Sequence, residues 1–75
     1  VIQFSLDTPS TYSLDVFDIL GRQVKSIDSG FKQAGVHNVI WDGRNDSNND
    51  VASGVYFYRL KTDDKTAIKR MLYLR

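Results

Sequence analysis

The strongest constraint on the fold of this chain is a hydrophobic pattern that repeats every two residues. Ile2, Phe4 and Leu6 alternate with Gln3 and Ser5, and the same spacing returns in five later segments. Successive side chains of a β-strand point to opposite faces, so this pattern predicts strands. No segment carries an apolar stripe at helical spacing over three turns. We therefore expect an all-β fold, and six strands separated by turns are typical of a sandwich or a small barrel.

The expected strands are separated by residues that favour turns. The run Phe17–Leu20 breaks the alternation just before Gly21, as a bulge or sharp bend does. We expect Asp28–Gly30 to end the third strand and Asp63–Asp64 to form a tight hairpin turn. The predicted strands cover residues 2–6, 12–16, 23–27, 36–41, 55–62 and 66–74.

The facing of the fourth strand is clear, whereas that of the last strand is not. In the fourth strand, His37, Val39 and Trp41 share one face. The last strand is ambiguous, because its apolar residues fall on both faces. Ile68, Leu72 and Leu74 alternate one way, while Met71 and Tyr73 alternate the other. A five-stranded oligonucleotide-binding barrel is the alternative fold, but it usually carries a helix that no segment here supplies.

Length and composition limit the function classes. The chain has 75 residues, enough for one domain with a thin core and no internal catalytic cavity. Its net charge is +1, and its nine acidic residues are all Asp, so it has no basic footprint for nucleic acid or an anionic membrane. It has no cysteine, which excludes disulfides and thiolate chemistry. No apolar run is long enough to span a bilayer, and no signal peptide is present.

Few residues suggest chemistry. His37 is the only histidine, and we interpret it as a half-buried residue near a strand end. The Asp42–Asp50 loop contains Asp46-x-Asn48-x-Asp50, the opening of an EF-hand calcium loop, but Val51 replaces the required glycine. We therefore expect a solvated turn. We predict no catalytic residues, no metal site and no cofactor, and hence no enzyme.

Aromatic and basic residues each allow two interpretations. Trp41, Tyr56, Phe57 and Tyr58 are interpreted as core and cross-strand pairs, and an outward Phe57 leaves a sugar-binding platform open. The basic end of the chain is read either as protection of an edge strand or as a recognition element. Its cations are Lys65, Lys69, Arg70 and Arg75.

Four segments resemble one known family. They are Leu14–Val24 (LDVFDILGRQV), Gly35–Asp46 (GVHNVIWDGRND), Val51–Leu60 (VASGVYFYRL) and Lys69–Arg75 (KRMLYLR). In this order and spacing they resemble the C-terminal sorting domains of bacterial type IX secretion cargo. The pattern is shared with the immunoglobulin-like domain of the flagellar hook-capping protein. The resemblance implies an antiparallel immunoglobulin-like β-sandwich of six to seven strands.

The resemblance also implies roles for individual residues. It makes residues 1–75 one immunoglobulin-like domain, which we expect to be a C-terminal fragment of a larger exported protein. Trp41 would anchor the core. The remaining fold positions would be Gly21, Arg22, Gly35 and Gly43. The residues implied in partner recognition are Gly54, Tyr56, Lys69, Arg70, Met71, Leu72, Tyr73, Leu74 and Arg75.

The leading hypothesis from the sequence is a sorting domain for type IX secretion. Its partners would be the outer-membrane secretion translocon and the N-terminal cargo domains of the same polypeptide. The protein would then be secreted or held on the surface of a Gram-negative bacterium, after passing through the periplasm. The alternative is a structural module, as a spacer or carbohydrate-binding unit of an extracellular hydrolase or in a hook-cap-like assembly. An unpaired edge strand could also support a weak homodimer.

Overall fold

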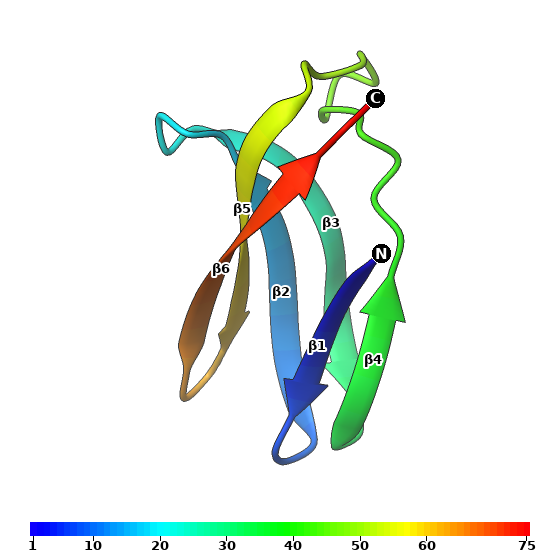
Figure 1. The fold of residues 1–75 in the computed structure, drawn as a ribbon. Helices are drawn as coiled ribbons and strands as arrows, with labels where there is room; N and C mark the ends of the chain where they lie inside the picture. The colour runs from blue at the N-terminus through cyan, green and yellow to red at the C-terminus, as the bar shows by residue number, and fades with distance from the viewer.

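The computed structural model describes residues 1–75 and contains six β-strands and no helix. β1 and β4 form a two-stranded antiparallel sheet, and the other strands form an antiparallel sheet in the order β3-β2-β5-β6. The chain crosses between the sheets after β1, β3 and β4 (Figure 1). This confirms the predicted immunoglobulin-like β-sandwich. The strands are β1 (Ile2–Leu6), β2 (Ser10–Phe17), β3 (Gln23–Lys32), β4 (Gly35–Val39), β5 (Gly54–Thr62) and β6 (Thr66–Tyr73).

The core lies between the two sheets. It is built from alternate positions of β1 and β2 together with one residue of β5, so the period-two pattern places its apolar residues inward. Leu14 and Val16 at its centre are fully buried. The seven core residues are Ile2, Phe4, Leu6, Tyr12, Leu14, Val16 and Tyr56.

One core residue is also tied to β3 by a polar contact. The Tyr12 hydroxyl donates a 2.6 Å hydrogen bond to Oδ2 of Asp28. Burial of the phenol and this hydrogen bond, next to the negative carboxylate, raise the pKa of Tyr12 to about 12. The phenol therefore stays neutral until strongly alkaline pH.

The third predicted strand ends too early. β3 continues through Asp28–Gly30 to Lys32, because β2 is long enough to pair with all of it. Tyr12 pairs with Gly30 and Ser10 pairs with Lys32. The ladder of hydrogen bonds outweighs the turn preference of the Asp-Ser-Gly sequence. The irregularity near Gly21 is real but lies slightly earlier, as two register shifts within the β2–β3 pair.

The fourth predicted strand ends too late. β4 stops at Val39, so Trp41 lies beyond the strand, although it still packs against the core from its edge. His37 is half-buried within β4 and lies 5.5 Å from the Phe4 ring, and its Nε2 is 2.8 Å from the carbonyl oxygen of Gln33.

The β5–β6 hairpin forms as predicted and decides the facing of the last strand. The Thr62 N–H donates to the Lys65 carbonyl across the Asp63–Asp64 turn, with a distance of 2.8 Å. Met71 and Tyr73 pack against the core. Ile68 and Leu72 are exposed on the opposite face.

Candidate functional site at the C-terminal strand

The predicted recognition residues lie mainly on β6, an edge strand of the four-stranded sheet. Lys69 pairs with Tyr58 and Arg70 pairs with Phe57 of β5, so these two cations point to opposite faces of the sheet. Both are exposed, and neither belongs to an ion pair. The exposed part of the predicted site therefore combines two unpaired cations with the apolar side chains of Leu72 and Leu74.

The end of β6 is fixed by the loop that precedes β5. The Tyr73 ring lies 5.0 Å from the Trp41 ring, measured between centroids, and 6.4 Å from that of Tyr56. Gly43 is buried against Tyr73 so closely that a Cβ there would overlap the phenol. These contacts make Tyr73 part of the fold.

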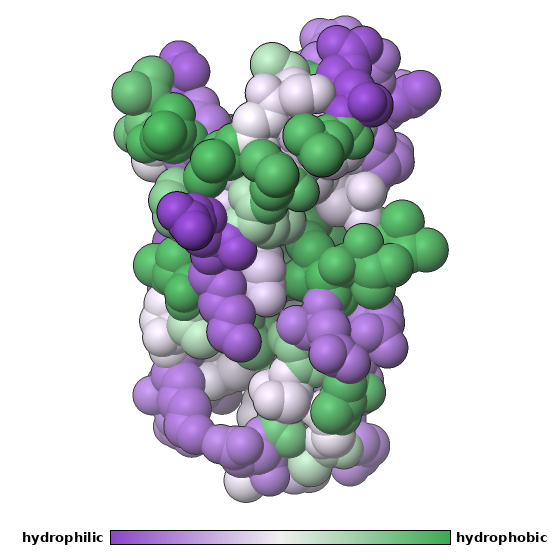
Figure 2. All heavy atoms as spheres, in the orientation of Figure 1, coloured by the Kyte–Doolittle hydropathy of each residue, from purple (hydrophilic) through white to green (hydrophobic).

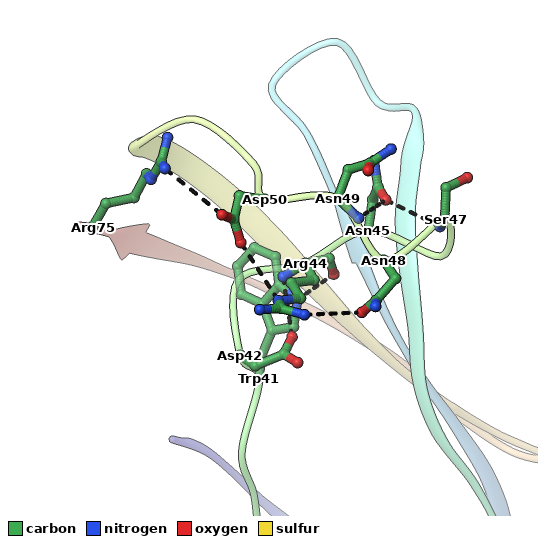
Figure 3. A network of polar contacts seen from close by, with 9 residues as sticks. All are labelled: Trp41, Asp42, Arg44, Asn45, Ser47, Asn48, Asn49, Asp50 and Arg75. Carbon is green, nitrogen blue, oxygen red and sulfur yellow. Dashed lines mark hydrogen bonds and ion pairs between the residues drawn. The ribbon is translucent and has the colours of Figure 1, made fainter.

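The last residue contacts the same loop. The Arg75 N–H donates a 3.0 Å hydrogen bond to Oγ of Ser53. Nη2 of Arg75 lies 3.8 Å from Oδ2 of Asp50 (Figure 3). The side chain of Leu74, between Tyr73 and Arg75 in the sequence, remains exposed. The chain end is therefore anchored on the fold.

The loop from Asp42 to Asp50 is organised by hydrogen bonds within itself. The Trp41 indole N–H donates to the Arg44 carbonyl at 3.0 Å, and Nε of Arg44 lies 3.5 Å from Oδ1 of Asp50. Oδ1 of Asn45 accepts the backbone N–H groups of Ser47 and Asn49 (Figure 3). These Asn and Asp side chains replace the backbone partners that a regular strand would supply.

All three members of the EF-hand-like triad contact protein donors, and Oδ1 of Asn48 lies 3.4 Å from Nη1 of Arg44. Oδ1 of Asp46 accepts the N–H of Ser26 on β3, whereas Asp50 is paired with Arg44 and Arg75. No group of three or more His, Cys, Asp or Glu side chains lies close enough together to hold a metal ion. The oxygens of this loop face protein donors.

The predicted glycine positions serve turns and close packing. Gly21 has a φ of 81° in the turn after β2. There Oδ1 of Asp18 accepts the N–H groups of Leu20 and Arg22, which lowers the pKa of Asp18, chiefly through the Arg22 N–H. Gly35 opens β4 with open space where its Cβ would be.

The Gly54-x-Tyr56 motif also has fold contacts. Gly54 pairs with Tyr73, and the buried Tyr56 donates its hydroxyl to the Ala52 carbonyl at 2.6 Å. The Tyr56 ring packs edge-on against Trp41 at 5.3 Å. This motif therefore pairs with the end of β6, and within it only Tyr56 is buried.

An ion pair between Arg59 and Asp15 has no signature in the sequence. On the outer face of the four-stranded sheet, Nη2 of Arg59 contacts Oδ2 of the buried Asp15 at 3.1 Å. The guanidinium also lies 4.7 Å from the Phe17 ring centroid, and Phe57 pairs with Phe17 across the strands. The alternation along β5 puts Arg59 on the face opposite Tyr58. Its partner does not follow from this pattern, because Asp15 is 44 residues away.

The aromatic residues do not form one platform. Phe57 faces outward beside Arg70 and Phe17, whereas Tyr73 packs inward on Trp41. Trp41, Tyr56 and Tyr58 pack in or against the core, so the idea of a sugar-binding surface rests on Phe57.

A comparison with protein-family models decides the family. Residues 1–66 match the model of the FlgD Ig-like domain. The chain belongs to this family. No curated protein and no solved structure was found to match it.

The family match of this FlgD Ig-like domain does not span all six strands. It covers β1 to β5 and ends at the first residue of β6. Residues 67–75, which hold most of the predicted recognition residues, lie outside it. The match supports the hook-capping side of the resemblance and does not address type IX sorting. The structure contains no helical segment with the length and apolar character that crossing a bilayer requires.

Proposed function

We propose that this FlgD Ig-like domain is a non-catalytic accessory module of a larger exported protein, working as a structural unit in an extracytoplasmic assembly of the hook-cap kind. The family match over residues 1–66 carries the proposal. Its neighbours would be the N-terminal domains of the same polypeptide. Its location would be the surface or surroundings of a Gram-negative bacterium, reached through the periplasm.

The contacts of the motif residues support a structural role. Trp41, Gly43 and Tyr56 pack on one another or on Tyr73, and their polar groups are satisfied within the chain. Polar groups that already have a partner inside the chain are not free to bind another protein. A motif whose side chains serve internal packing is typical of a rigid structural module.

A second candidate is a sorting domain for type IX secretion, read by the outer-membrane translocon. One observation favours it. Lys69 and Arg70 are exposed and unpaired on an edge strand that lies outside the family match. In this candidate the terminal strand is the signal, and removal of the domain after export would follow.

An export assay separates the two functions. A fluorescent reporter would be fused in front of residues 1–75 in a type IX-competent bacterium, beside a Lys69→Glu/Arg70→Glu copy. A Lys25→Glu/Lys32→Glu copy makes the same charge change on β3, at the other edge of the same sheet. The structural proposal predicts that all three fusions have the same location.

The opposite result is equally clear. Export of the intact and β3-reversed fusions, with retention of the Lys69→Glu/Arg70→Glu fusion in the periplasm, would replace the structural proposal with sorting. Circular dichroism of the purified variants checks that each still folds.

A further inference from the structure

β6 offers a regular free edge for pairing. It is joined to β5 by eight consecutive residue pairs without a register shift, from Gly54–Tyr73 to Lys61–Thr66. No strand pairs with its other side. A free edge presents unpaired backbone N–H and C=O groups, which can hydrogen-bond to an added strand.

The other exposed edges are less suited to pairing. β3 is the second edge of the same sheet, and its pairing with β2 carries two register shifts that distort it. β1 and β4 have only five residues each. Beyond β1, Asp7 forms an ion pair with Lys65. β6 is therefore the longest undistorted edge.

Apolar surface adjoins this edge. Ile68 and Leu72 of β6 are 62% and 65% exposed. Ile68 also lines a shallow groove of about 270 Å³ on the outer face. Figure 2 shows hydrophobic and hydrophilic surface side by side on the side of the molecule that carries β6. An edge that only avoided partners would not need large exposed aliphatic side chains. The groove is lined by Phe17, Asp18, Ile19, Gly21, Phe57, Arg59 and Ile68.

The charges of this region select the kind of partner. β6 contains Lys69 and Arg70 and no acidic residue, and Lys61 of β5 is also exposed without an ion pair. The nearest acids along the chain, Asp63 and Asp64, lie in the turn beyond the strand. In the adjacent groove, Arg59 is already paired with Asp15 and Asp18 with Arg22, so the free charges near the edge are those of Lys61, Lys69 and Arg70. A segment with carboxylates complements these cations.

The same charges oppose pairing with a second copy. Two β6 strands related by a twofold axis must pair residues that lie on the same face. Registers centred on the middle of the strand then place Lys69 opposite Lys69, or Arg70 opposite Arg70. Like charges directly opposite each other destabilise a strand pair.

We propose that β6 binds an extended, acidic and apolar segment of a partner polypeptide by strand addition. In an antiparallel arrangement, residues opposite Leu72 and Met71 are apolar, those opposite Arg70 and Lys69 are acidic, and the one opposite Ile68 is apolar. The binding does not depend on whether the module is structural or a sorting domain, since either role can use a strand-binding edge.

The test uses the 75-residue chain and three synthetic peptides with capped ends. The first has the core Val-Val-Glu-Glu-Val between Ser-Thr flanks, the second replaces both Glu by Lys, and the third scrambles the first. Binding is followed by amide chemical shifts and by hydrogen exchange in isotope-labelled protein. We expect the acidic peptide alone to shift the amides of residues 66–73 and to slow their exchange.

Matched variants test the charges. Lys69→Glu/Arg70→Glu should weaken binding of the acidic peptide about tenfold or more, which corresponds to about 1.4 kcal/mol. Lys25→Glu/Lys32→Glu on β3 should leave it unchanged. If the charge-reversed variant misfolds, binding of the three peptides to the unaltered chain still shows whether β6 selects acidic residues.

Three results would overturn the proposal. The first is that the acidic peptide shifts no amides of residues 66–73, or shifts them no more than the Lys and scrambled peptides do. Another is a response centred on β1 or β3. The third is a concentration-dependent dimer that protects β6, because the occupant would then be a second copy. None of these results bears on the export assay, so the two proposals can fail separately.

Discussion

Replacing Gly43 by alanine tests whether the loop before β5 holds the end of β6. Gly43 has a φ of 76°, and an added Cβ would overlap the Tyr73 phenol. Alanine in left-handed backbone costs about 1 kcal/mol. Moving the Tyr73 ring away from Trp41 and Tyr56 is an overpacking cost of about 2 kcal/mol. We therefore expect Gly43→Ala to lower the free energy of unfolding by about 3 kcal/mol.

Gly21 provides a matched control for the backbone cost. Its φ is 81°, and nothing lies within 4 Å of where its Cβ would be. Gly21→Ala should therefore cost only about 1 kcal/mol. Urea unfolding followed by circular dichroism and by the fluorescence of the single Trp41 measures both values.

A double-mutant cycle isolates the contact with Tyr73. In a Tyr73→Ala background the phenol is gone, so Gly43→Ala should cost about 1 kcal/mol, as Gly21→Ala does. The reasoning is refuted if Gly43→Ala and Gly21→Ala cost the same in the unaltered chain, or if the cost at Gly43 survives removal of the ring.

Three further predictions concern the core and the outer face. The pKa of Tyr12 is raised to about 12, mainly by burial, so the stability it contributes is intact below about pH 10 and is lost as pH rises toward 12; urea titrations at pH 9–12 should show a decline that Tyr12→Phe reduces. Leu14→Ala should cost about 3 kcal/mol in urea unfolding because Leu14 is fully buried, and a loss below about 1 kcal/mol would contradict the core assignment. Asp15→Ala leaves the Arg59 guanidinium without its carboxylate partner and should cost about 2 kcal/mol, whereas Asp7→Ala at an exposed ion pair should cost less than about 0.5 kcal/mol in the same assay.

The strands and most of the core could be predicted from the sequence because their signal is local. Ile2, Phe4 and Leu6 alternate with polar residues, and all three are buried as the alternation requires. The β5–β6 hairpin follows in the same way from a strand-prone segment, two Asp residues and a second strand. Both features depend on residues that are neighbours in the chain.

The candidate site was only partly predictable. The sequence drew attention to Lys69 and Arg70, and the structure places them on an edge strand. The family resemblance also places Tyr73 among the recognition residues, whereas the structure places the Tyr73 ring against Trp41. The resemblance to a family cannot separate a residue used for packing from one used for contact, since both recur in a motif.

Alone, the sequence determined that the chain forms β-strands, most of them with one apolar face, because successive side chains of a strand alternate between its two faces. The tertiary structure decided where β3 ends, since the β2 ladder had to supply partners for Asp28–Gly30. It also decided which face of β6 is inward, since both faces carry apolar residues and the contact of Tyr73 with Trp41 breaks the tie. Pairings between distant residues leave no local pattern, so only the folded chain reveals them.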